Sequence, residues 1–98
     1  MNHLIALALS MSAITSYADE ALLKKNNCMA CHAVDKKVVG PAYKDVAAKY
    51  KGQAMTDKLA AKIRAGGSGV WGPVPMPANT QVSEADAKKM ATWILNVK

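Results

Sequence analysis

The chain contains no phenylalanine, and few of its side chains are large. Its 98 residues include 2 Trp, 3 Tyr and 2 Cys, and much of its 51% hydrophobic content is alanine. Two cysteines are too few for the disulfide-dense framework of a small secreted scaffold, and the length excludes a multidomain enzyme. Domains of this size usually need a disulfide, a metal or another bound group to complete their core. The composition therefore predicts that something other than side chains fills the interior.

Charge is absent from the N-terminal segment, because all 13 Lys+Arg and 7 Asp+Glu follow residue 18. The segment combines a short apolar run with small residues at Ser16 and Ala18, which is typical of a secretory signal peptide, although the usual basic start is missing. The run is too short to span a bilayer, which takes about 20 apolar residues. We expect 1–18 to be a cleaved signal peptide and 19–98 to be a single periplasmic domain without stable membrane insertion.

Hydrophobic periodicity predicts about four short helices and no strand. Helices are expected over 20–25 with Asp19 as the cap, over 43–51, over 57–64 with Thr56 as the cap, and over 83–97. Residues 65–82 hold four glycines and three prolines, which predicts an unusually long loop. Trp71 and its valine neighbours argue against disorder there, since disordered segments avoid such side chains. The predicted fold class is all-α.

The most specific motif is Cys28-Met29-Ala30-Cys31-His32, the C-x-x-C-H pattern of c-type haem attachment. Two thiols three residues apart on a helical turn can each add to one vinyl group of a porphyrin, and the adjacent imidazole is then carried under the iron. A thioredoxin-like dithiol would need a preceding strand, a structural zinc site would need a fourth ligand, and a disulfide closing so short a loop would constrain little. The motif predicts one covalently attached haem c.

The second axial ligand is predicted to be a methionine, because His32 is the only histidine after residue 18. The candidates are Met29, Met55, Met76 and Met90. Met29 lies inside the attachment loop, Met55 lies in a polar connector, and Met90 belongs to the apolar stripe of the last helix. Met76 stands between two prolines that stiffen the backbone, so it is the predicted ligand, with ordinary loop packing as the alternative. Asn79 either donates a hydrogen bond near the sulfur or forms a turn.

These motifs resemble those of the small single-haem bacterial class I cytochromes c of the c-551/c-552 type. The resemblance extends over the region after residue 18 and rests on 28–32, 39–47, 69–77 and the last helix with Trp93. It implies N- and C-terminal helices that cross, with one haem in a cleft. It also implies that Cys28 and Cys31 form the thioether bonds and that His32 and Met76 are the axial pair.

The resemblance implies further contacts with the haem. The carbonyl of Pro41 would accept a hydrogen bond from the His32 ring, which orients that ring. The indole N–H of Trp71 would face a haem propionate, and Lys62 falls where some relatives place a basic residue near that propionate. Tyr43 would either donate a hydrogen bond in the haem crevice or simply pack.

The implied function is a soluble monomeric electron carrier that cycles between Fe(III) and Fe(II) and has no catalytic activity of its own. It would pass electrons to a terminal reductase or oxidase. The alternative is a small haem enzyme or gas sensor with a labile sixth ligand. A thiol–disulfide redox module is a third possibility, and it requires Cys28 and Cys31 to be free or exchangeable.

The net charge of +6 predicts an acidic redox partner. The partners implied are nitrite reductase, cytochrome oxidase or an upstream quinol-oxidising complex. A basic ring around an exposed haem edge would include Lys24, Lys25, Lys36 and Lys37, which flank the attachment motif in sequence; scattered solvated lysines are the alternative. Nucleic acid is not an expected partner, because the chain has an export signal and no nucleic-acid-binding motif.

Overall fold

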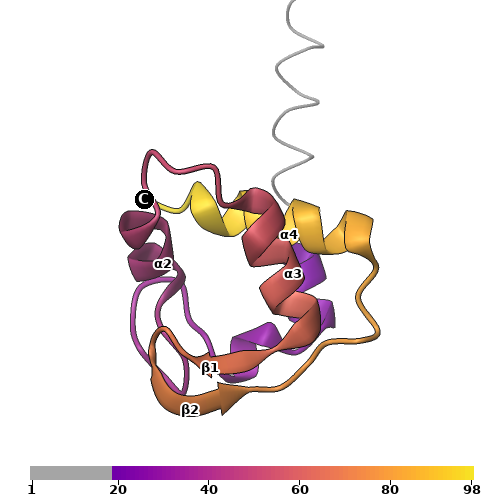
Figure 1. Cartoon of the computed structure of the whole chain (residues 1–98), viewed down its shortest axis with the longest axis horizontal. Coiled ribbons are helices and arrows are strands. Elements are labelled where there is room, and N and C mark those ends of the chain that lie inside the picture. The colour runs from indigo at the N-terminus through magenta and orange to yellow at the C-terminus, as the bar shows by residue number, and fades with distance from the viewer. Residues whose placement is uncertain (1–18) are drawn as a thin grey trace, which may run out of the picture.

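The computed structural model describes residues 19–98, so the expected signal peptide lies outside the described residues. Residues 19–25 are helical. They are followed by η1 (Cys28–Ala30), α2 (Tyr43–Lys49), α3 (Thr56–Ala65), β1 (Gly67–Gly69), β2 (Gly72–Met76) and α4 (Glu84–Leu95). In the view of Figure 1, α4 crosses the top, α2 lies at the left and the β1–β2 hairpin runs along the bottom. The helices predicted from the sequence are therefore present, each within a few residues of its expected bounds.

Helix α4 has the clearest sequence determinants of its start and of its buried face. The Ser83 hydroxyl accepts a hydrogen bond from the Asp86 amide at 3.1 Å, which satisfies one of the unpaired donors of the first turn. Glu84 and Asp86 also place negative charge near the positive end of the helix dipole. The buried residues of α4 are Ala87, Met90, Ala91 and Ile94, at the helical spacing that forms one face.

The core is a small apolar cluster between the helices. Helix α4 packs against both α3 and α2. The cluster consists of Leu23, Tyr43, Val46, Ala60, Ile63, Val82, Ala87, Met90, Ala91 and Ile94. Leu23 and Met90 are its largest fully buried side chains. Leu23 comes from the helical residues 19–25, so the two ends of the domain share this core.

The prediction that residues 65–82 contain no strand is wrong. β1 and β2 form an antiparallel pair in which Gly67 lies opposite Met76 and Gly69 lies opposite Gly72, with an irregularity in the register between them. The tight reversal depends on Gly69 and Gly72, whose φ angles of 110° and 118° are strained for any other residue. A strand rich in proline is tolerated because the sheet has only two strands, so both are edges.

Among residues 19–98, no helix is both long enough and apolar enough to cross a bilayer.

Replacing Met90 with Ala should destabilise the protein by about 2–5 kcal/mol, because a fully buried side chain leaves a cavity that the neighbouring helices fill only in part. The half-buried Met55 is the matched control, and Met55→Ala should cost much less. Chemical denaturation of both variants measures the difference. Equal losses for the two substitutions would contradict the assignment of Met90 to the core.

Candidate haem-binding site

The attachment motif forms a single tight turn. Asn27 adopts a left-handed conformation with φ of 60°, and η1 follows it directly. The carbonyl oxygen of Cys28 accepts hydrogen bonds from the amides of Cys31 at 3.2 Å and of His32 at 3.0 Å. Both cysteines are free thiols, and both line the same cavity as His32. The turn therefore presents two unbridged thiols and an imidazole to one space.

The His32 ring is held by three neighbours. Its Nδ1 lies 2.8 Å from the carbonyl oxygen of Pro41, and since a carbonyl can only accept, Nδ1 must be the protonated nitrogen. The ring stacks on Tyr43 with centroids 5.1 Å apart and an interplanar angle of 22°. Gly40 lies so close that an added Cβ would overlap the ring. This arrangement leaves the lone pair of Nε2 available to a metal.

Tyr43 connects the attachment turn to the core. It is only 3% exposed, and its ring meets the Trp93 ring edge-on at a centroid distance of 6.1 Å. Burial raises the pKa of the Tyr43 hydroxyl, and the neighbouring Cys28 raises it further. Burial also raises the pKa of the Cys28 thiol, while a hydrogen bond with Tyr43 acts in the opposite direction. Tyr43 therefore stays neutral at physiological pH and packs as an aromatic side chain of the core.

Met76 reaches the same cavity from the hairpin. It is the last residue of β2 and is half-buried. Of the four methionines in residues 19–98, it alone lines the cavity. The end of α3 packs tightly against this segment, because a Cβ added at Gly66 would lie 2.7 Å from the amide nitrogen of Ala78.

Asn79 anchors the chain that follows Met76 to the end of α3. Its backbone amide donates to the carbonyl of Arg64 at 3.2 Å, and its side-chain amide donates to the carbonyl of Ile63 at 3.0 Å. A longer contact of 3.5 Å joins the same amide to Pro77. Of the two roles expected for Asn79, the structure shows the one that shapes the loop.

The cavity has a volume of about 350 Å³, within the range typical of ligand sites. Its lining includes every residue that the sequence assigns to the site, namely Cys28, Cys31, His32, Pro41, Trp71 and Met76, and also Tyr43, Lys62 and Asn79. Valines, prolines, a leucine and two isoleucines make up much of the rest. Two thiols, an imidazole and a thioether around an apolar cavity fit a covalently attached haem and its iron.

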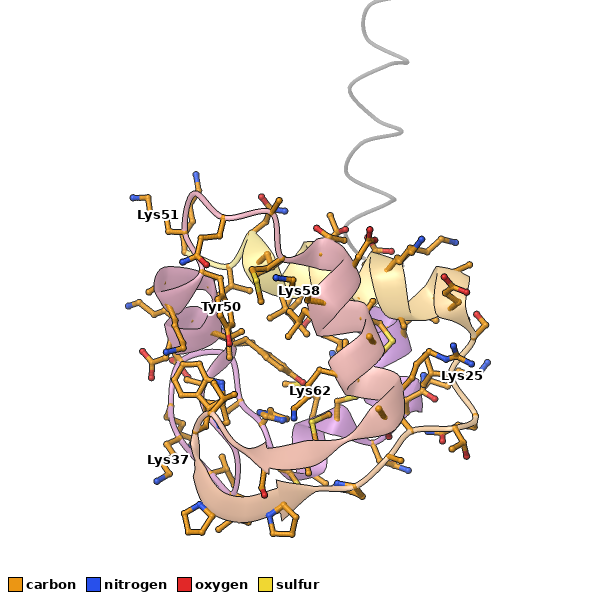
Figure 2. All side chains as sticks on the ribbon, viewed as in Figure 1. Lys25, Lys37, Tyr50, Lys51, Lys58 and Lys62 are labelled. Atoms are coloured by element: carbon orange, nitrogen blue, oxygen red, sulfur yellow. The ribbon has the colours of Figure 1, made fainter. Side chains whose placement is uncertain are left out.

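Two lysines lie where the hairpin approaches the helices. Figure 2 shows Lys62 extending from α3 toward the middle of the molecule, whereas Lys25 and Lys37 lie on opposite sides of it. The ammonium nitrogen of Lys62 would be 2.5 Å from a Cβ added at Gly67, so this side chain lies over the start of β1. The ammonium nitrogen of Lys49 lies 5.5 Å from the centroid of the Trp71 ring.

Residues 20–98 match the sequence profile of the family described as Cytochrome c. The chain belongs to the cytochrome c family. It is 63% identical over 83 residues to cytochrome c-552 of Nitrosomonas europaea, which covers 83% of this chain and 80% of that protein. It is 59% identical over 80 residues to cytochrome c-551 of Azotobacter vinelandii, which covers 81% of this chain and 96% of that protein.

The fold comparison agrees with the family. The crystal structure of wild-type N. europaea cytochrome c552 superposes with a TM-score of 0.77 at 59% identity, covering 81% of this chain and 99% of that one. The prediction of a class I cytochrome c fold is confirmed. Like other members of its family, this cytochrome c carries one covalently attached haem c, for which Cys28 and Cys31 form the C-x-x-C-H motif, and it is a protein of electron transport.

Two contributors to the site are missing from the sequence-based predictions. Gly40 contacts the His32 ring, and its position directly before Pro41 was the one signal that could have identified it. Lys49 lies over the ring of Trp71, which lines the cavity. No pattern in the sequence identifies Lys49, because the contact exists only once the hairpin has folded back toward α2.

Replacing Gly40 with Ala should displace the His32 ring, because the added methyl group has no room beside it. We expect a loss of about 1–3 kcal/mol in stability and a measurable shift in the reduction potential of the haem protein. Gly52→Ala is the control, because Gly52 has a φ of 78° but faces open space. This substitution should lower stability through backbone strain and leave the reduction potential of the haem unchanged. A Gly40→Ala protein with the parent's potential would contradict this account of the ring.

Stability should fall at alkaline pH partly because of Tyr43. The unfolded chain releases the tyrosine proton above pH ~10, whereas the folded chain retains it because burial raises the pKa of Tyr43. The contribution of the Tyr43 proton to the unfolding free energy is fully present below pH ~10. Above pH ~10 it is lost, by up to about 1.4 kcal/mol per pH unit. Tyr43→Phe should therefore show a shallower decline in unfolding free energy between pH 9 and 11. Parallel pH profiles for the two proteins would rule this contribution out.

Proposed function

We propose that this cytochrome c is exported, loses residues 1–18 and serves in the periplasm as a small monomeric electron carrier whose axial ligands are His32 and Met76. The observation that carries the proposal is that Cys28, Cys31, His32 and Met76 all line one cavity. When bound there, the haem iron supplies a one-electron couple between Fe(III) and Fe(II).

His32 is the axial ligand that the fold fixes most firmly. Its Nδ1 donates to the Pro41 carbonyl at 2.8 Å, so Nε2 is the ring nitrogen left to bind the iron. Tyr43 stacks on the ring, and the backbone of Gly40 lies against it with no room for a side chain. A ring held in this way moves little when the charge on the iron changes, which suits an electron carrier.

Met76 is the second axial ligand. A thioether is a weak donor that raises the reduction potential, so the backbone must hold it in position. Prolines on both sides restrict the backbone, and Asn79 ties the following loop to α3. With both axial positions filled by protein, no site remains for a substrate, and the protein catalyses no reaction by itself.

Trp71 and Lys62 would bind the haem carboxylates. Both line the cavity, and each comes from a different wall, Trp71 from the apex of the hairpin and Lys62 from α3. The indole N–H and the ammonium group are hydrogen-bond donors suited to carboxylates. Both residues could therefore hold the carboxylates of an attached haem.

The redox partner is an acidic protein: nitrite reductase, cytochrome oxidase or an upstream quinol-oxidising complex. A net charge of +6 favours such a partner by long-range attraction. Lys37 lines the cavity and is exposed, so it lies where the partner would approach the haem.

Replacing Met76 with Ala should remove the sixth ligand. We expect the low-spin absorption spectrum of the oxidised protein to become high-spin, and the reduced protein to bind carbon monoxide readily, because a position on the iron is vacated. Met55→Ala is the matched control, since Met55 does not line the cavity, and it should keep the parent's spectrum. Low-spin coordination that persists in Met76→Ala would mean that another residue is the ligand. Carbon monoxide binding by the parent protein would favour the haem enzyme or gas sensor instead.

Association with an acidic partner should slow as ionic strength rises, because salt screens the attraction between the two proteins. Stopped-flow measurement of the second-order rate of electron transfer tests this over a range of salt concentrations. Lys37→Gln should lower the rate at low salt more than Lys98→Gln, because the C-terminus lies at the far side of the molecule from the hairpin (Figure 1). A rate that does not depend on salt would contradict electrostatic steering.

A further inference from the structure

The apex of the β1–β2 hairpin is the least supported wall of the haem cavity. Among the named helices and strands, β1 and β2 pack chiefly on each other, whereas α4 packs on both α3 and α2. Val70 and Trp71, at the apex, are 55% and 43% exposed. The opposite end of the hairpin is anchored, because Gly66 packs against the segment after Met76 and Asn79 is bonded to α3. The apex therefore needs a contact of its own to stay closed over the cavity.

Lys49 provides that contact. It lies in the last turn of α2, and its ammonium nitrogen is 5.5 Å from the centroid of the Trp71 ring and 5.9 Å from that of Tyr50. Both distances are within the range of a cation–π interaction. One cation is thus shared between the end of α2 and the apex of the hairpin.

The ammonium group of Lys49 has no carboxylate partner among residues 19–98. The ion pairs of this region join Lys24 with Glu20 and Lys88 with Asp57 and Glu84. Lys49 also lies at the C-terminal end of α2, where a cation is favoured because that end of a helix carries partial negative charge. Lys49 is therefore available to the aromatic rings and is not drawn away by a stronger partner.

We propose that Lys49 is a positioning residue that latches the hairpin to α2 by holding its ammonium group against the Trp71 ring. The latch keeps the apex closed across the mouth of the cavity, which excludes water from the attached haem. The inference goes beyond the proposed function and requires only the attached haem, not a particular axial pair. The test of Lys49 is therefore independent of the result for Met76→Ala.

Hydrogen exchange of backbone amides in the haem-bound, reduced protein, followed by NMR, tests the latch. Loss of an exposed cation–π contact should speed exchange of the β1 and β2 amides about two- to five-fold in Lys49→Gln, with α4 amides unchanged. Lys49→Arg should retain the parent's rates, because a guanidinium also stacks on aromatic rings. Lys51→Gln is the matched control: it removes the same charge two residues away, from a side chain that Figure 2 shows projecting away from the hairpin, and it should leave the rates unchanged.

A double-mutant cycle identifies the ring through which Lys49 acts. Trp71→Leu removes the aromatic face, so adding Lys49→Gln to it should produce no further change in hairpin exchange. The proposal is overturned if Lys49→Gln and Lys51→Gln change exchange equally. It is also overturned if Lys49→Gln has its full effect in the Trp71→Leu protein, since Lys49 would then act through Tyr50 or through charge alone.

Discussion

The 2.8 Å hydrogen bond between His32 Nδ1 and the Pro41 carbonyl fixes the geometry on which the rest of the site depends. It joins the attachment turn to the residues just before α2, so the imidazole is oriented by the same segment that sets the direction of that helix. Backbone hydrogen bonds from Tyr43 to Ala33 and from Lys44 to Val34, both at 2.9 Å, reinforce the connection. The turn, the imidazole and α2 consequently behave as one unit, and the Tyr43 ring joins this unit to α4 through Trp93.

The core of this domain is built from small side chains, and the cavity lies beside that core. Four of the buried core residues on the helices are alanines at positions 47, 60, 87 and 91, which contribute little apolar area. They allow the helices to approach closely, but they leave a core whose largest fully buried side chains are Leu23 and Met90. The attached haem would supply the large apolar body that the side chains do not, so that cofactor and core would form one packing arrangement.

The sequence was sufficient to predict the helices and the donor atoms, because both depend on local pattern. The spacing of Cys28, Cys31 and His32 implies one turn, and the apolar stripe of α4 implies one buried face. The hairpin was not predictable in the same way, because a segment rich in glycine and proline has the composition of a loop, and its reversal depends on positive φ angles at Gly69 and Gly72. The contacts of Gly40 and Lys49 depend on tertiary proximity, which no local pattern encodes.

The prolines of β2 have a consequence for behaviour in concentrated solution. Pro73 and Pro75 lack backbone N–H groups, so this five-residue strand offers fewer donors to any additional strand. A two-stranded sheet has exposed edges, and such edges are the usual sites at which copies of a protein join by strand addition. The same residues that stiffen the approach to Met76 thereby discourage self-association of the surface that closes the haem cavity.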